Sequence, residues 1–265
     1  MKKDKSKKFK YTPKYFSDNL PAWKKRKDPP LSRVLYRPLS FITASIATRF
    51  GVSANAVSYL SLIIAIAACA LLVIPNRACN IIGAVLVNLW LLSDCTDGNI
   101  ARSVKKQPFG AFADSISSYL LVAFLGISLG IYDYFNDGLL ISSGNIWLVL
   151  VGAIASISDT LMRLIYNKYK ISERELVDEG RIEHEVEKRE DNNQSGSLIV
   201  RIESDFGIGG WIPIFVLLGV IFGFADIVTI YCCAYYGLSA LVMISKYVRK
   251  AIKKQHYIEA KERNN

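Results

Sequence analysis

The sequence has few of the residues that mark a secreted, disulfide-stabilised domain. It contains only 5 cysteines in 265 residues, with no CxxC motif and no pairing pattern, so we interpret them as small buried apolar residues. The first 40 residues lack the apolar core of a cleavable signal peptide, and we expect none. The 2 histidines, His184 and His256, give no indication of a functional site.

Charge is absent from six long stretches of the chain. Each is close to the roughly 20 residues needed to cross the hydrocarbon of a bilayer. The stretches cover approximately residues 52–74, 78–93, 115–132, 138–158, 206–225 and 227–245. The chain is also 51% hydrophobic, with a net charge of +10. This composition predicts an all-α membrane protein with six transmembrane helices.

The positive charge is concentrated near the N-terminus. Residues 1–50 hold 14 lysines and arginines against 3 aspartates, a net charge of +11. Such a segment suits nucleic acid or anionic lipid head groups. Because six apolar spans follow it, we predict anionic membrane lipid as its partner and no nucleic acid.

The distribution of charge also predicts segments and orientation. We expect a basic cytoplasmic tail at 1–30, an amphipathic juxtamembrane helix broken near Pro38 at 31–50, a six-helix domain at 51–250 with a charged insertion at 170–205, and a polar tail at 251–265. The insertion either regulates the protein or extends the fourth span as a solvated helix, and we favour the extension. Lysine and arginine in the 102–108 loop place both termini on the cytoplasmic side of a membrane such as that of a bacterial cell.

The segment SDCTDGNIARSVKKQPFGAFADSISSY places acidic residues where two apolar spans meet. Asp94 and Asp97 share one helix face, and Gly110, Asp114 and Ser118, spaced by four, share a face of the next helix. The short connection makes these helices antiparallel neighbours, so three carboxylates converge. A divalent cation would relieve their repulsion, and oxygen ligands suit Mg²⁺ or Mn²⁺.

Small residues and an arginine accompany these carboxylates. Arg102 can neutralise one of the three carboxylates and can help to hold a diphosphate. Gly98, Ala101 and Gly110 either leave room for a flat ligand or simply allow close helix packing. Acidic residues that bind a metal, one arginine, and a gap left by small residues together favour a diphosphate-binding site.

The stretch DCTDGNIARSVKKQPFGAFAD closely resembles the signature of the CDP-alcohol phosphotransferase (CDP-alcohol phosphatidyltransferase) family. That signature reads D-x-x-D-G-x-x-A-R, then about eight residues, then G-x-x-x-D-x-x-x-D. The resemblance implies metal-dependent transfer of a substituted phosphate from a CDP-alcohol to an acceptor hydroxyl, release of CMP, and a homodimer. It further implies that Asp94, Asp97 and Asp114 bind Mg²⁺ or Mn²⁺, that Arg102 holds the donor phosphates, and that Gly98, Ala101 and Gly110 make room for the nucleotide.

The sequence departs from this signature at two points. Seven residues separate Arg102 from Gly110, one fewer than usual. Ser118 stands where the family has an aspartate that is its proposed general base, and serine cannot take up a proton unaided. A metal or Asp114 could activate the acceptor, the acceptor could bring an acidic group, or the chain could be a CDP-lipid-binding pseudoenzyme.

Two further positions bear on the function. Asp159 and Arg163 lie four residues apart in the fourth span, where they either form a self-satisfied ion pair or line an acceptor pocket. Asn55 either caps the first span or faces the nucleotide. We predict CDP-diacylglycerol as the donor, since the metal site lies at the lipid boundary, while the acceptor alcohol stays open. A transporter and a prenyltransferase are less favoured, since the acids cluster at one face and no second aspartate-rich motif follows.

Overall fold

The structure, a computed structural model, describes residues 10–182 and 205–263, and every regular element within those ranges is a helix. The elements in order are α1 (Pro13–Asp18), α2 (Ala22–Lys27), the π-helix η1 (Ser32–Tyr36), α3 (Arg37–Arg49), α4 (Ala54–Leu72), α5 (Arg77–Ser103), α6 (Gly110–Phe135), α7 (Ile146–Asp178), α9 (Ile212–Phe222) and α10 (Ala225–Arg263). The prediction of an all-α fold is confirmed.

Five of these helices, α4, α5, α6, α7 and α10, are long and apolar enough to cross a membrane. The chain is therefore an integral membrane protein. The predicted span at 206–225 is different, because α9 has only 11 residues and rises roughly 16 Å, which is short of the hydrocarbon thickness. It is preceded by turns around Gly207 and Gly210, and Gly223 ends it in a left-handed conformation.

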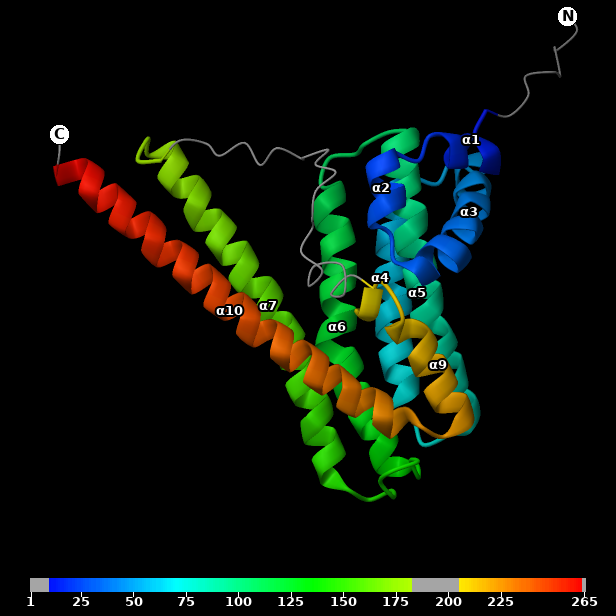
Figure 1. The fold of residues 1–265 in the computed structure, drawn as a ribbon. Helices are drawn as coiled ribbons and strands as arrows, with labels where there is room; N and C mark the ends of the chain where they lie inside the picture. Colours follow the sequence, from blue (N-terminus) through cyan, green and yellow to red (C-terminus); the bar gives the residue numbers. More distant parts are fainter. Residues whose placement is uncertain (1–9, 183–204, 264–265) are drawn as a thin grey trace, which may run out of the picture.

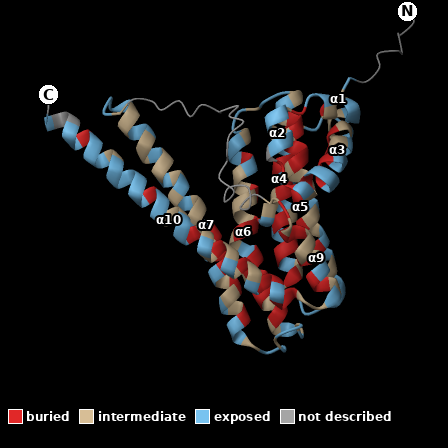
Figure 2. Cartoon of the chain, in the orientation of Figure 1, coloured by how far each residue is buried: buried red, intermediate tan, exposed pale blue. Residues whose placement is uncertain are grey.

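The long helices form two groups (Figure 1). Helices α5 and α6 both pack on α4, while α7 and α10 lie side by side and run diagonally away from α6. Helices α6 and α7 meet where Gly126 faces Gly152. A Cβ atom on Gly152 would lie 2.2 Å from the carbonyl oxygen of Gly126, so these two backbones touch and admit no side chain. Buried residues concentrate around the α4–α6 group and this crossing (Figure 2).

The N-terminal region differs from the predicted tail. Residues 13–27 form α1 and α2, and Phe16 is 1% exposed. The hydroxyl of Tyr15 donates a hydrogen bond to the carbonyl of Ser103 at 2.9 Å. Apolar packing thus holds this basic segment against the end of α5. The predicted break near Pro38 is absent: η1 runs into α3 without interruption, because Pro38 lies in the first turn of α3, where a proline is tolerated.

Helices α7 and α10 extend beyond their apolar spans. Helix α7 runs to Asp178, as the predicted extension of the fourth span requires, and α10 continues to Arg263 where we expected a tail. Glu173 on α7 pairs with Lys254 on α10 and with Lys170 at 3.1 Å. The remainder of the predicted insertion, with His184, lies outside the described residues.

Candidate active site

The acidic segment occupies the end of α5 and the start of α6, at the same end of the bundle as the N-terminal helices (Figure 1). Buried hydrogen bonds fix the register one turn away. The Ser117 hydroxyl on α6 accepts from Trp90 Nε1 on α5 at 2.8 Å and lies 2.7 Å from the Ser61 hydroxyl on α4. Since α4 contacts both helices, it sets how closely the acidic faces of α5 and α6 approach.

Three aspartates come together at this end. Asp94 is half-buried and its carboxyl interacts directly with that of Asp114, which is exposed. Asp97 is buried, interacts electrostatically with both, and accepts a hydrogen bond of 2.5 Å from the Ser58 hydroxyl. Asp94 and Asp114 therefore bring like charges together across α5 and α6, whereas Asp97 does not complete a group of three with them.

This arrangement fits a divalent cation through its donor set. Asp94 and Asp114 face each other with only acceptor oxygens, which is the chemistry that Mg²⁺ and Mn²⁺ prefer. Asp97 is engaged by Ser58. Within the described residues, no three acidic, histidine or cysteine side chains are close enough to hold a metal as they stand. As they stand, Asp94 and Asp114 form a pair, and Asp97 is held separately by Ser58.

The small residues of the segment have different surroundings. The guanidinium of Arg102 lies over Gly98, where an added Cβ would be 2.9 Å from Nη1. An added Cβ on Gly110 would be 3.3 Å from the Asn55 side-chain oxygen. Ala101 packs instead against a small apolar cluster that includes Ile100. Gly98 is therefore covered by Arg102, and Gly110 lies close to the Asn55 side chain.

Asn55 holds the connection between the two helices. Its side-chain NH₂ donates to the Pro108 carbonyl at 2.9 Å, and its backbone N–H donates to the Gln107 side chain at 3.0 Å. Ser53, not Asn55, caps α4, because its hydroxyl accepts from the Ala56 N–H. Asn55 thus positions the start of α6 rather than capping a helix.

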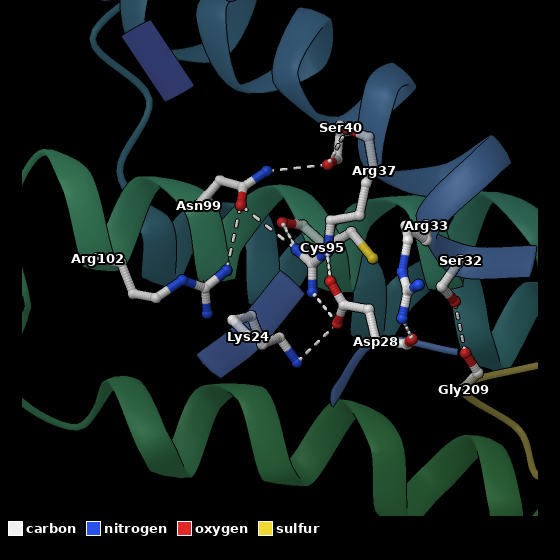
Figure 3. A network of polar contacts seen from close by, with 10 residues as sticks. All are labelled: Lys24, Asp28, Ser32, Arg33, Arg37, Ser40, Cys95, Asn99, Arg102 and Gly209. Carbon is white, nitrogen blue, oxygen red and sulfur yellow. Dashed lines mark hydrogen bonds and ion pairs between the residues drawn. The ribbon is translucent and has the colours of Figure 1, made fainter. Parts of the chain in front are cut away.

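A polar network behind Arg102 links the N-terminal helices to α5 (Figure 3). Arg37 forms two hydrogen bonds to the Asp28 carboxylate, at 2.6 and 2.9 Å. The side-chain oxygen of Asn99 accepts from Arg37 at 3.3 Å and from Arg102 at 3.1 Å, and its NH₂ donates to Ser40 at 2.9 Å. One amide thereby aligns two guanidinium groups.

The charges in this network are buried and paired. Arg37 is 5% exposed and Asp28 4% exposed, while Lys24 lies 3.2 Å from Asp28. Burial alone would raise the pKa of Asp28, but hydrogen bonds from Arg37 and the charge of Lys24 hold that pKa below its usual value. Arg37, which the sequence placed on a membrane-facing amphipathic helix, therefore points into the protein.

The comparison with known families agrees with this geometry. Residues 51–181 match the model of the family described as CDP-alcohol phosphatidyltransferase. These residues form a CDP-alcohol phosphatidyltransferase domain. A search of curated proteins gave no match to the chain. The matched segment contains α4–α7 and every site residue predicted from the sequence, whereas the N-terminal helices, α9 and α10 lie outside it.

A cavity of about 320 Å³ adjoins the phosphatidyltransferase motif. Of the predicted site residues, Asp94, Asp159 and Arg163 line it. Segments outside the family match complete the lining, and they contribute Lys24, Asp28, Arg37, Gly209 and Tyr236. The cavity is therefore built jointly by the family domain and its flanking helices.

Asp159 and Arg163 form the predicted ion pair, with Arg163 Nε 2.9 Å from Asp159 Oδ1. The guanidinium also lies over the ring of Tyr119, 5.7 Å from its centre. Asp159 is 1% exposed, and its Oδ2 has no hydrogen-bond partner among the described residues. The pair is thus only half satisfied within the protein, and both of its members face the cavity.

Ser118 is half-buried and its hydroxyl donates to the Ser115 carbonyl at 3.0 Å, within its own helix. Sequence reasoning missed Arg37, Asn99, Ser58 and Tyr236. Asn99 lies inside the motif, so its position beside Arg102 could have been predicted from the sequence. Arg37 and Tyr236 lie far from the motif along the chain, where spacing carries no information.

Proposed function

We propose that the chain transfers the substituted phosphate of a CDP-alcohol to an acceptor hydroxyl and releases CMP. The direct approach of Asp94 and Asp114, inside a phosphatidyltransferase domain, carries this proposal. Two facing carboxylates repel each other unless a cation lies between them. We assign Mg²⁺ or Mn²⁺ to Asp94, Asp97 and Asp114, with Asp97 turning from Ser58 to join the other two.

The remaining residues bind and orient the donor. A bound divalent ion would neutralise the diphosphate and the charge that develops on CMP. Arg102 donates hydrogen bonds to the donor phosphates, and Asn99 holds its guanidinium in place. Gly98 lies beneath the Arg102 guanidinium, so its backbone opens to the nucleotide only when Arg102 moves onto the donor phosphates, while the small residues Gly110 and Ala101 allow close packing nearby.

The position of the site suggests the donor and the side of the membrane. The acidic residues lie near the ends of two apolar helices, which suits a lipid-linked donor such as CDP-diacylglycerol. The loop that follows carries Lys105 and Lys106, which favours the cytoplasmic side. The polar acceptor stays open, and the homodimer and the contact of the basic N-terminus with anionic lipid stay predictions.

A second candidate function is non-catalytic binding of a CDP-lipid. Ser118 favours it, because the hydroxyl at the usual base position is bonded within its own helix and cannot act as a base unaided. This candidate predicts metal-dependent binding of CDP-diacylglycerol without release of CMP.

Release of CMP by the purified full chain tests the proposal. The assay contains CDP-diacylglycerol, Mg²⁺ or Mn²⁺, and a panel of polar alcohols that includes glycerol phosphate, inositol phosphate and serine. We expect metal-dependent release, and a loss of at least about 100-fold for Asp114→Asn. Asp137→Asn is the matched control, because Asp137 is a carboxylate in a loop beyond the far end of α6.

Either of two results would contradict the proposal. Equal release by wild type and Asp114→Asn would remove the assigned metal ligand from the reaction. Donor binding without CMP, followed by release from Ser118→Asp, would identify the wild-type chain as a binding protein.

A further inference from the structure

Two buried polar atoms without partners among the described residues belong to side chains that line the cavity beside the motif. Within residues 10–182 and 205–263, Asp159 Oδ2 on α7 and the Tyr236 hydroxyl on α10 make no hydrogen bond, although their residues are only 1% and 9% exposed. Both residues line the cavity together with Asp94. Because buried polar groups are normally paired, two unpaired ones on one cavity indicate a polar ligand.

The two oxygens of the Asp159 carboxylate differ: Oδ1 is hydrogen-bonded, and Oδ2 has no partner among the described residues. Arg163 donates to Oδ1 at 2.9 Å and is itself placed over the ring of Tyr119. This leaves Oδ2 as an acceptor that the described residues do not use. A purely structural ion pair would gain by satisfying both oxygens, and Arg163 has further N–H donors with which to do so.

The position of Asp159 relates it to Ser118. Asp159 also lines a narrow void with Val122, one turn along α6 from Ser118. A carboxylate on α7 therefore faces α6 near the place where the family signature has its last aspartate. The Tyr236 hydroxyl is close enough to Asp159 to interact with its charge.

We propose that Asp159 is the catalytic base for the acceptor hydroxyl, in place of the aspartate that Ser118 replaces, and that Tyr236 orients that hydroxyl. This inference rests on the proposed phosphotransfer. The acceptor O–H donates to Asp159 Oδ2, and its oxygen accepts from the Tyr236 hydroxyl. Asp94, to which we assign the metal that binds the donor phosphates, lines the same cavity.

The proposed step balances. The acceptor oxygen forms a bond to the phosphorus that carries the alcohol, while its proton passes to Asp159 Oδ2. The bond between that phosphorus and the oxygen bridging to the cytidine phosphate breaks, and CMP leaves with the electron pair. Asp159 then releases the proton to water, which restores the carboxylate.

The test compares wild type, Asp159→Asn, Ser118→Asp and the double variant Asp159→Asn/Ser118→Asp as full-length purified proteins. CMP release is measured with CDP-diacylglycerol, Mn²⁺ and the alcohol panel, and equilibrium binding is measured with CDP and Mn²⁺. We expect Asp159→Asn to lower turnover by about 100-fold while CDP affinity changes less than about twofold. The double variant should regain at least about tenfold, because a carboxylate returns to the position of the family base.

Rescue by Ser118→Asp would support the inference, since a merely structural defect at Asp159 would not be repaired from another helix. Asp159→Asn with nearly wild-type turnover would overturn the inference and leave the proposed function standing. A wild-type protein that binds CDP but releases no CMP would overturn the proposed function and the inference with it.

Tyr236→Phe covers the case in which Asp159→Asn fails to fold, because it keeps the ring and removes only the unpartnered hydroxyl. We expect a rise of about tenfold in acceptor KM with CDP affinity retained. An unchanged acceptor KM would overturn the assigned ligand contact.

Discussion

The two ends of the helix bundle treat their carboxylates differently. At the end near the 136–145 loop, Asp226 accepts hydrogen bonds from the backbone N–H groups of Leu139, Leu140 and Ile141, at 3.1, 2.7 and 3.0 Å. Asp133 there accepts from the Thr229 hydroxyl at 2.5 Å. At the motif end Asp97 also has a hydroxyl donor, Ser58, but the carboxylates of Asp94 and Asp159 are less completely paired by the described residues.

At the motif end, Asp94 faces Asp114 directly, and Asp159 keeps one unpartnered buried oxygen. Burying a charge without a donor opposes folding, so such groups are retained where a ligand completes them. The far end therefore shows carboxylates used for structure, and the motif end shows carboxylates held ready for a metal and a substrate.

We expect the largest effect on stability at Asp28. This residue lines the motif-end cavity, yet its carboxylate is paired with Arg37 and Lys24. Asp28→Asn leaves the buried Arg37 guanidinium without its partner and should lower the free energy of unfolding by about 3 kcal/mol. Thermal unfolding in detergent measures this loss. Arg33→Gln is the control, since Arg33 bonds only the backbone carbonyl of Asp28 within this network.

The same pair predicts a pH dependence. The folded-state pKa of Asp28 is lowered, so its stabilisation is present above the unfolded pKa of about 4 and is lost as the pH falls below it. The stability difference between wild type and Asp28→Asn should therefore shrink in acid. A difference that stays constant from neutral pH to about pH 3 would contradict the assigned pair.

Asp226→Asn should have a smaller effect of the same sign. The substitution removes the charge that three backbone N–H groups share, and the partly exposed loop can recover some bonds from water. We expect a loss of about 2 kcal/mol, measured by thermal unfolding, with metal binding unchanged. A loss of metal affinity in this variant would show that the two ends are not independent.

Asp94→Asn should have the smallest effect and the opposite sign. Removing one of two facing carboxylates relieves their repulsion, so the metal-free protein should gain about 1 kcal/mol. The rise in unfolding temperature that Mg²⁺ gives the wild type should disappear in this variant. A destabilised variant that still responds to Mg²⁺ would place Asp94 among the structural carboxylates instead.

The part of the site that the sequence predicts is the part built by local spacing. Asp94 and Asp97 on one helix, and Asp114 on the next, are related by helical periodicity and a short loop. The pairing of Arg37 with Asp28 and Asn99 depends on α3 packing across α5, which no spacing reveals. The net charge of residues 1–50 predicted that Arg37 lies on a lipid-facing helix. Composition cannot distinguish a buried, paired arginine from an exposed one.

The fold follows the same division. Apolar length identified the five long helices, but it gave 206–225 as a span, because hydropathy does not register where a helix is interrupted by glycine-rich turns. The basic composition of residues 1–30 likewise predicted a tail and not the helices α1 and α2. These helices depend on the packing of Phe16 against an apolar cluster on α3 and α4.

The contact between Gly126 and Gly152 is the point about which the crossing angle of α6 and α7 can change. Asp114 lies twelve residues from this crossing along α6, a lever of about 18 Å, and Asp159 lies about 10 Å along α7. A change of roughly 10° in the angle between these helices would move the Asp114 end by about 3 Å while the glycine backbones stay in touch. Such a pivot would change the separation of the two carboxylates while only the Ser156 hydroxyl, which bonds the Ile127 N–H at the crossing, has to adjust.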